Sequence, residues 1–189
     1  MFKLSTAIIF MSTSIAFAAD CSSWQNPYPN VAHLKPYSVP VENLADHLNQ
    51  SEFTHGFELG ISLQAGDLRV EVISVPGDTL SAAGLMILLQ VSRLAKEDFE
   101  RLVLTEDGEA IYFLDADTAR EAGCQASWGV PSTHGSPLPL FVLLMGNMKS
   151  IDGKPVVKRY TGSWLRDMNI ALEAYNVSVA ADWIHSAVR

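Results

Sequence analysis

Residues 59–72 read LGISLQAGDLRVEV, and this segment determines the class of fold expected for the chain. Apolar residues alternate with small, polar or charged ones on both sides of the turn at residues 65–67. The apolar positions are Leu59, Ile61, Leu63, Leu68, Val70 and Val72. A period of two on either side of a glycine-containing turn predicts a β-hairpin with one buried face.

The segments after the hairpin repeat its plan in outline. Residues 79–95 are apolar almost all round at helical spacing, which predicts a buried central helix. A second alternating segment, residues 102–114, turns at Glu106-Asp107-Gly108 and predicts a second hairpin. A short helix is expected over 115–122, with Gly123 ending it.

Three further segments complete the expected domain. A helix begins after Pro40, and the apolar run at 140–145 fits a buried strand, although periodicity also allows a helix there. A long C-terminal helix begins after Ser163, and weak helix formers at 176–179 predict a kink or break. The fold class expected is α+β: an antiparallel sheet of four to six strands, including the two hairpins, packed against the central and C-terminal helices.

The first residues have the pattern of a secretory signal peptide. Lys3 precedes an apolar, hydroxyl-rich stretch, and Ala16-Phe17-Ala18 is a small-x-small cleavage site, so cleavage is expected after Ala18 or Ala19. The stretch is too short and too rich in Ser and Thr to span a membrane comfortably, although a retained anchor is the alternative. We expect a signal peptide over 1–18, an extended proline-rich arm over 19–39, and one domain over 40–189 in a periplasmic or secreted protein.

Export would place the two cysteines in an oxidising compartment. In an oxidising compartment Cys21 and Cys124, with no other cysteine in the chain, are expected to form one disulfide. The alternative is a catalytic thiol at Cys124 served by a histidine, which requires Cys21 to be unpaired.

Signs of catalysis are weak. Ser132 and His134 lie in a breaker-rich loop over 129–139 and resemble a nucleophile beside a base, but the strained Gly-x-Ser-x-Gly turn of a hydrolytic serine is missing. The five histidines stand singly, without the spacing of a zinc site, and no glycine-rich phosphate loop is present. We therefore expect no metal and no cofactor, and favour a polar loop over a catalytic one.

Charge is distributed unevenly along the chain, whose formal net charge is −8. Residues 97–121 hold nine acidic residues against Arg101 and Arg120, whereas residues 149–166 hold five basic residues and one acidic residue. Such runs usually mark solvated turns and helix ends. The sharper interpretation makes the acidic hairpin tip, Glu106, Asp107 and Glu109, a contact for a basic partner protein. Nucleic acid is not expected as a partner, because phosphates repel an acidic protein.

Composition excludes several classes of protein without naming a reaction. With 48% hydrophobic and 18% charged residues in a chain of 189, disordered, collagen-like and coiled-coil proteins are excluded. The expected function is a non-catalytic exported protein that binds another protein, as an accessory factor or an inhibitor or immunity-type protein. Two alternatives stay open: a cell-envelope hydrolase with a site near 129–139, and a small-ligand carrier lined by Trp164, Tyr175 and Trp183.

Overall fold

The computed structural model describes residues 37–51, 54, 56–76, 83–128 and 138–187. The elements, in chain order, are α1 (Val41–Asn49), β1 (Glu58–Gln64), β2 (Asp67–Ser74), α2 (Ala83–Leu94), β3 (Arg101–Glu106), β4 (Glu109–Asp115), α3 (Ala116–Trp128), α4 (Leu138–Asn147), β5 (Lys149–Ser150), α5 (Trp164–Ala174), the π-helix η3 (Tyr175–Val179), α6 (Ala180–Trp183) and the 3-10 helix η4 (His185–Ala187). The expected signal peptide, Cys21, Ser132 and His134 lie outside the described residues.

The five strands form one open sheet in the order β1-β2-β3-β4-β5. Both predicted hairpins are confirmed as antiparallel pairs, β1 with β2 and β3 with β4. The two hairpins join through a parallel pair, with Asp67 opposite Arg101 and Glu71 opposite Thr105. The sheet is therefore mixed rather than wholly antiparallel, because α2 returns the chain to the edge at which β2 began.

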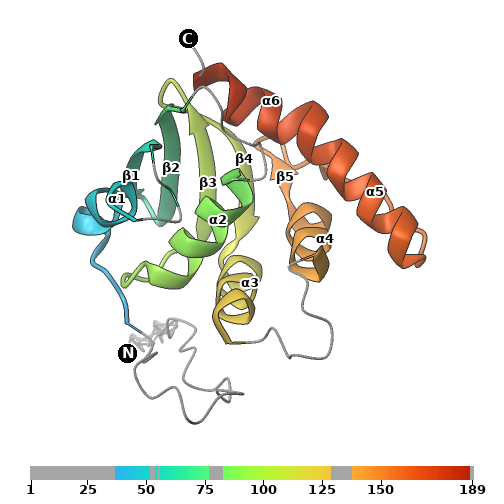
Figure 1. The fold of residues 1–189 in the computed structure, drawn as a ribbon, viewed down its shortest axis with the longest axis horizontal. Helices are drawn as coiled ribbons and strands as arrows, with labels where there is room; N and C mark the ends of the chain where they lie inside the picture. The colour runs from blue at the N-terminus through green and yellow to red at the C-terminus, as the bar shows by residue number, and fades with distance from the viewer. Residues whose placement is uncertain (1–36, 52–53, 55, 77–82, 129–137, 188–189) are drawn as a thin grey trace, which may run out of the picture.

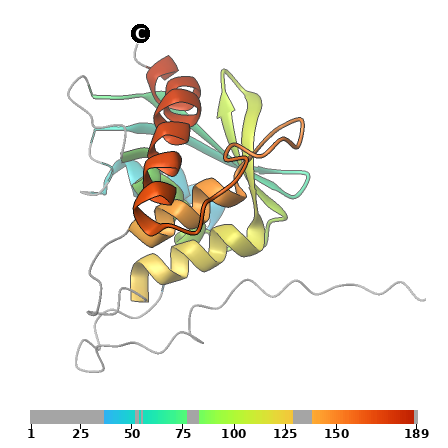
Figure 2. The ribbon, with the colours of Figure 1, turned by 90° about the vertical axis from the view of Figure 1, so that its right-hand side faces the viewer.

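All the long helices pack against one face of this sheet (Figures 1 and 2). Alternation within β2 directs Leu68, Val70 and Val72 into the core, whereas Arg69 and Glu71 lie on the opposite face. The expected α+β class is confirmed, including the central helix and the long C-terminal helix.

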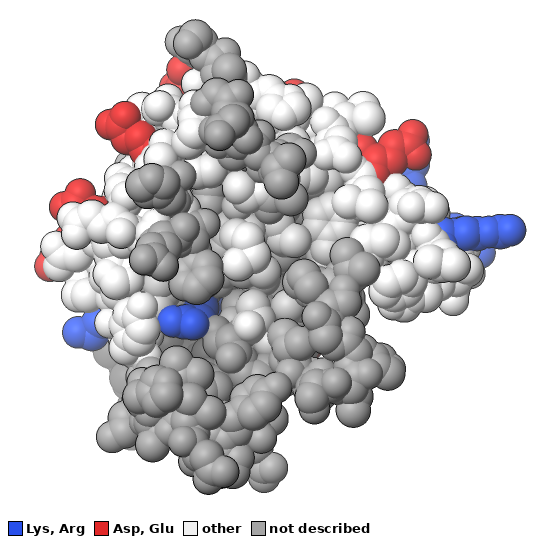
Figure 3. All heavy atoms as spheres, viewed as in Figure 1, with Lys and Arg blue, Asp and Glu red and all other residues white. Residues whose placement is uncertain are grey.

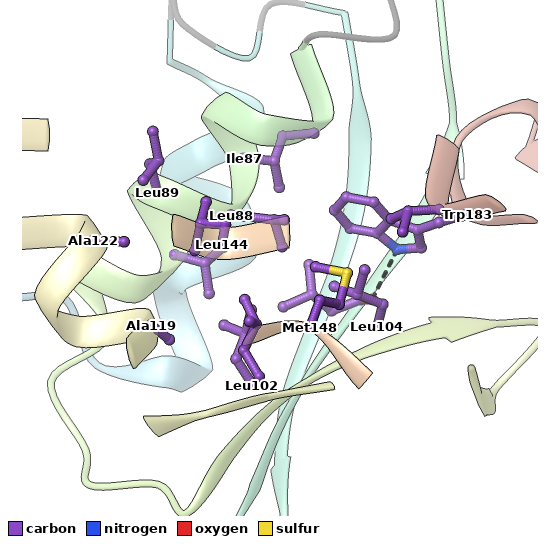
Figure 4. Close-up of a cluster of buried hydrophobic side chains, with 14 of the residues drawn as sticks. Ile87, Leu88, Leu89, Leu102, Leu104, Ala119, Ala122, Leu144, Met148 and Trp183 are labelled. Atoms are coloured by element: carbon purple, nitrogen blue, oxygen red, sulfur yellow. Dashed lines mark hydrogen bonds between the residues drawn. The ribbon is translucent and has the colours of Figure 1, made fainter. Parts of the chain in front are cut away.

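The centre of the core joins segments that are far apart in the sequence (Figure 4). It contains Ile87, Leu88 and Leu89 of α2, Leu102 and Leu104 of β3, Ala119 and Ala122 of α3, Leu144 of α4, Met148 and Trp183 of α6. Trp183 is 1% exposed, and its indole Nε1–H donates to the carbonyl oxygen of Val70 at 3.2 Å. This contact fixes the end of the C-terminal helix on β2.

The apolar run at 140–145 is helical, so the expectation of a strand there was wrong. An uninterrupted apolar run has no period that separates a buried strand from a buried helix. The run lies in α4, which packs between α3 and α5, and the two-residue strand β5 occupies the place beside β4 instead. As a helix, the segment satisfies its backbone groups without needing a free sheet edge.

Gly123 does not end α3, which continues to Trp128. A β-carbon at this position would lie 2.8 Å from the backbone nitrogen of Arg93 in α2. The glycine is therefore a site of close helix packing and not a C-terminal cap.

Residues 176–179, where a kink or break was predicted, lie in a π-helical turn, Tyr175–Val179, that joins α5 to α6 without a break. A π-turn widens the helix locally and adjusts which side chains face the core. Tyr175 and Val179 are both buried. In the part of the chain that the structure describes, no helix has the length and apolar character needed to cross a membrane.

Candidate functional site

A surface hollow of about 230 Å³ lies where the parallel strands β2 and β3 end. Its lining comes from β2, from the β3–β4 turn and from η4, and consists of Glu71, Val72, Ile73, Glu106, Asp107, Ser186 and Ala187. Three carboxylates thus surround one depression, and no basic residue is among its described lining. We call this set the acidic hollow.

The parallel pairing brings the acidic residues together. Because β2 and β3 run the same way, their carboxyl ends meet at one edge of the sheet. Glu71 lies opposite Thr105, whose hydroxyl donates to the Glu71 carboxylate at 3.5 Å. Ile73 follows two residues later on the same face of β2 and is 51% exposed.

The second wall of the hollow is the tight turn between β3 and β4. Asp107 and Gly108 both have positive φ angles, 49° and 80°, as hairpin turns of two residues require. The carbonyl oxygen of Gly108 accepts a hydrogen bond from the Arg69 guanidinium of β2. The acidic turn is therefore tied to the first hairpin.

The third wall is η4, at the end of the C-terminal helical segment. Asp182 of α6, just before it, links this end to the sheet. The Tyr112 hydroxyl of β4 donates to the Asp182 carboxylate at 2.6 Å, and the Ser186 hydroxyl donates to the Asp182 carbonyl oxygen at 2.8 Å. Burial, reinforced by this hydrogen bond and by the charge of Asp182, raises the pKa of Tyr112. The shift extends to higher pH the range over which the Tyr112 hydroxyl stays protonated and donates to Asp182.

Elsewhere on the outer face of the sheet, acidic residues have basic partners. The Arg101 guanidinium contacts both carboxylate oxygens of Asp67, at 2.7 and 2.8 Å, and the Lys149 ammonium lies 2.8 Å from an oxygen of Asp115. Arg101 and Lys149 also lie over the Phe113 ring, at 5.2 and 5.5 Å from its centroid. These two ion pairs lie outside the hollow, whose described lining holds three acidic residues and no basic one.

The structure separates the three residues predicted to bind a partner. Glu106 and Asp107 line the hollow, whereas Glu109 is exposed at the start of β4 and does not line it. The sequence analysis missed Glu71 and Ile73. The alternation over residues 59–72 placed Glu71 on the outer face and did not extend to Ile73, and nothing in the sequence showed that β2 and β3 are parallel and end side by side.

The other predicted sites are dispersed. Tyr175 and Trp183 are 2% and 1% exposed and belong to the core, while Trp164 is 53% exposed, so these aromatics do not line a shared crevice for a carried ligand. Cys124 is buried in α3, and its expected partner Cys21 is not described. Ser132 and His134 are likewise outside the described residues.

The described residues were also compared with the arrangement of side chains that a metal site needs. Among the described residues, no group of three or more His, Cys, Asp or Glu side chains has an arrangement that could hold a metal ion. No protein-family model, curated protein or solved structure matches this chain.

Proposed function

We propose that this protein is an exported, non-catalytic binding protein whose acidic hollow receives a basic side chain of a partner protein. The observation that carries the proposal is the convergence of Glu71, Glu106 and Asp107 on one depression beside the exposed Ile73. A depression lined by one sign of charge concentrates the field and attracts a complementary group.

The size and lining of the hollow favour a single side chain over a small-molecule ligand. Pockets for drug-sized ligands usually enclose roughly 300–1,000 Å³, and the hollow, at about 230 Å³, is smaller. Lys and Arg side chains carry an apolar stem and a charged end. Ile73 offers apolar surface to the stem, and the three carboxylates offer acceptors to the cation.

Photocross-linking tests the proposal in the cells that produce the protein. A photoreactive phenylalanine analogue at Ile73 should yield an adduct with another protein, and the cross-linked peptide of that protein should contain Lys or Arg. Leu63, which is 39% exposed on β1, provides a control position for the same analogue.

Isosteric neutralisation then tests the role of charge. The double variant Glu106→Gln plus Asp107→Asn keeps the shape of the turn, since Asn tolerates positive φ as Asp does. It should reduce the adduct at least roughly tenfold, in line with loss of charged contacts. Glu109→Gln, on the same hairpin but outside the hollow, should leave the adduct unchanged. An adduct insensitive to the double variant would refute the proposal.

A further inference from the structure

The end of the molecule at which α5 begins combines exposed apolar side chains with basic ones. Trp164 is 53% exposed and Leu165 is 71% exposed. Lys158, Arg159 and Arg166 are also exposed. We call these five residues the basic tip; Figure 3 shows Lys and Arg atoms projecting from the right-hand edge of the molecule, where α5 lies in that view.

The basic residues of the tip are not engaged in ion pairs, in contrast to the other basic residues nearby, although Figure 3 shows Asp or Glu atoms beside the Lys and Arg atoms at this edge. Lys149 pairs with Asp115 and Lys154 pairs with Asp152. Within the described ranges, Lys158, Arg159 and Arg166 form no ion pair. Asp167, the acidic residue closest in sequence, is occupied by hydrogen bonds from Thr161 and Gly162.

The tip is held in its conformation by contacts beneath it. The Tyr160 hydroxyl donates to the carbonyl oxygen of Val142 in α4 at 2.9 Å, and burial of its ring, helped by the charge of Asp167, raises the pKa of Tyr160 to about 12. Asp167 binds the two residues that precede Ser163. The loop that leads into α5 is therefore fixed, and Trp164 and Leu165, the first two residues of that helix, are presented to solvent beside it.

We infer that the basic tip binds an anionic lipid surface. Trp is favoured at the headgroup level of a membrane, where its ring meets the acyl boundary and its N–H stays hydrated. Lys and Arg beside such an anchor each strengthen binding to anionic lipid, by roughly fivefold per residue. One Trp and one Leu with three cations give a reversible, peripheral contact.

The position of the tip suits a protein that is acidic overall. The acidic hollow is lined by Ser186 and Ala187, at the other end of the same helical segment. At 1.5 Å per residue the two sites lie about 30 Å apart, several times the Debye length of about 8 Å at physiological ionic strength. An anionic membrane can therefore attract the tip while the carboxylates of the hollow lie beyond the range of its screened field.

Vesicle flotation with the full chain, as recovered from the producing cells, tests this inference. Vesicles of phosphatidylcholine alone are compared with vesicles holding about a third phosphatidylglycerol. We expect binding to the anionic vesicles only, and weaker binding at 0.5 M than at 0.15 M NaCl, roughly, because salt screens the contact. Every variant shares the same N-terminus, so differences between variants report on the tip.

Matched variants assign the binding to these residues. The triple variant Lys158→Gln, Arg159→Gln, Arg166→Gln should bind anionic vesicles at least roughly tenfold more weakly, and Trp164→Ser should also lose most binding. Controls are Lys96→Gln, an exposed cation elsewhere, and Val177→Ser, which removes a 70% exposed side chain from the same helical segment. Both should bind like wild type.

Two results would overturn the inference. One is that the protein binds both kinds of vesicle equally, or binds neither. In that case the basic tip would be a surface for an acidic protein and not for a membrane. The other is wild-type binding by the triple variant. Glu106→Gln plus Asp107→Asn should leave vesicle binding unchanged, so a failure of the proposed function of the hollow remains distinguishable from a failure at the tip. Circular dichroism melting of each variant confirms that it is folded.

Discussion

Asp167 fixes the loop that leads into α5, although it lies inside the first turns of that helix. Its carboxylate accepts hydrogen bonds from the Thr161 amide at 2.7 Å, the Thr161 hydroxyl at 2.8 Å and the Gly162 amide at 2.9 Å. Burial by itself would raise the pKa of this carboxyl group. The hydrogen bonds from Thr161 and Gly162 outweigh burial, and the pKa of Asp167 lies below its usual value.

This depressed pKa predicts a pH dependence with a defined sign. The charged carboxylate stabilises the loop fully above the unfolded-state pKa of about 3.9, and its contribution is lost as the pH falls through the lower folded-state pKa. In an NMR titration, the amide protons of Thr161 and Gly162 should shift together with a midpoint below about 3.9. Asp167→Asn should abolish the transition, and a midpoint above that value would contradict the assignment.

Arg120 shows why single buried charges escape sequence analysis. It is 6% exposed, and its guanidinium donates to the carbonyl oxygens of Ser92, Ala95 and Glu97 at 3.1, 2.6 and 2.8 Å. These carbonyls belong to the last turn of α2 and the loop after it, which lack partners within the helix. In the sequence Arg120 was one of two bases among nine acids and indicated a solvated surface. Its burial depends on how α3 crosses α2, which no local pattern encodes.

At the scale of elements, replacing Gly123 by alanine is a test of helix packing. Helix propensity predicts that the change stabilises the protein, whereas packing of α3 against α2 predicts that it destabilises it. Replacing glycine by alanine inside a helix usually stabilises a protein by roughly 0.5–1 kcal/mol. Here the added β-carbon would lie 2.8 Å from the Arg93 nitrogen and 3.0 Å from the Ser92 β-carbon. Since the first of these is backbone, α3 must move away from α2 to accept it.

We therefore expect Gly123→Ala to lower the free energy of unfolding by about 1–3 kcal/mol, the usual cost of overpacking. Urea denaturation followed by circular dichroism measures this change. Glu121→Ala, on the exposed side of the same helix, serves as control and should stay within about 0.5 kcal/mol of wild type. Stabilisation by Gly123→Ala would show that the two helices are not in close contact.

The two hairpins and the buried helix α2 could be predicted because their signals are local. Period-two alternation around residues 65–67 and 106–108 identified four of the five strands. The parallel pairing of β2 with β3 could not be predicted, because it depends on where α2 returns the chain. For the same reason, only part of the acidic hollow could be predicted. Glu106 and Asp107 were identified from local charge, whereas Glu71 and Ile73 lie beside them only because β2 and β3 are parallel neighbours.

At the scale of the whole molecule, the net charge of −8 conceals a polarised surface. Ion pairs such as Asp67 with Arg101 neutralise much of the sheet face. The acidic residues of the hollow and the basic residues of the tip lie at the two ends of the C-terminal helical segment. A protein held at an anionic surface by its tip would present the hollow outward to a partner, so the two proposals are compatible although neither depends on the other.

The predicted disulfide between Cys21 and Cys124 concerns the whole molecule, because it would tie the N-terminal arm to the middle of the domain. Cys124 is 1% exposed in α3, so a free thiol there would also resist alkylation in the native state. The test therefore alkylates the protein after denaturation without reductant and measures its intact mass. We expect no alkyl group to be added, and two groups after reduction.

Closing a loop of about 100 residues stabilises a protein by roughly 4–5 kcal/mol in the chain-entropy description, with strain reducing the effect. The double variant Cys21→Ala plus Cys124→Ala should therefore unfold at clearly lower urea concentration than wild type, and reductant should lower the stability of wild type to about that of the variant. Reductant should leave the variant itself unchanged, because it has no bond to break. Two alkyl groups on the unreduced protein would instead leave Cys124 as a buried thiol and remove the link between arm and domain.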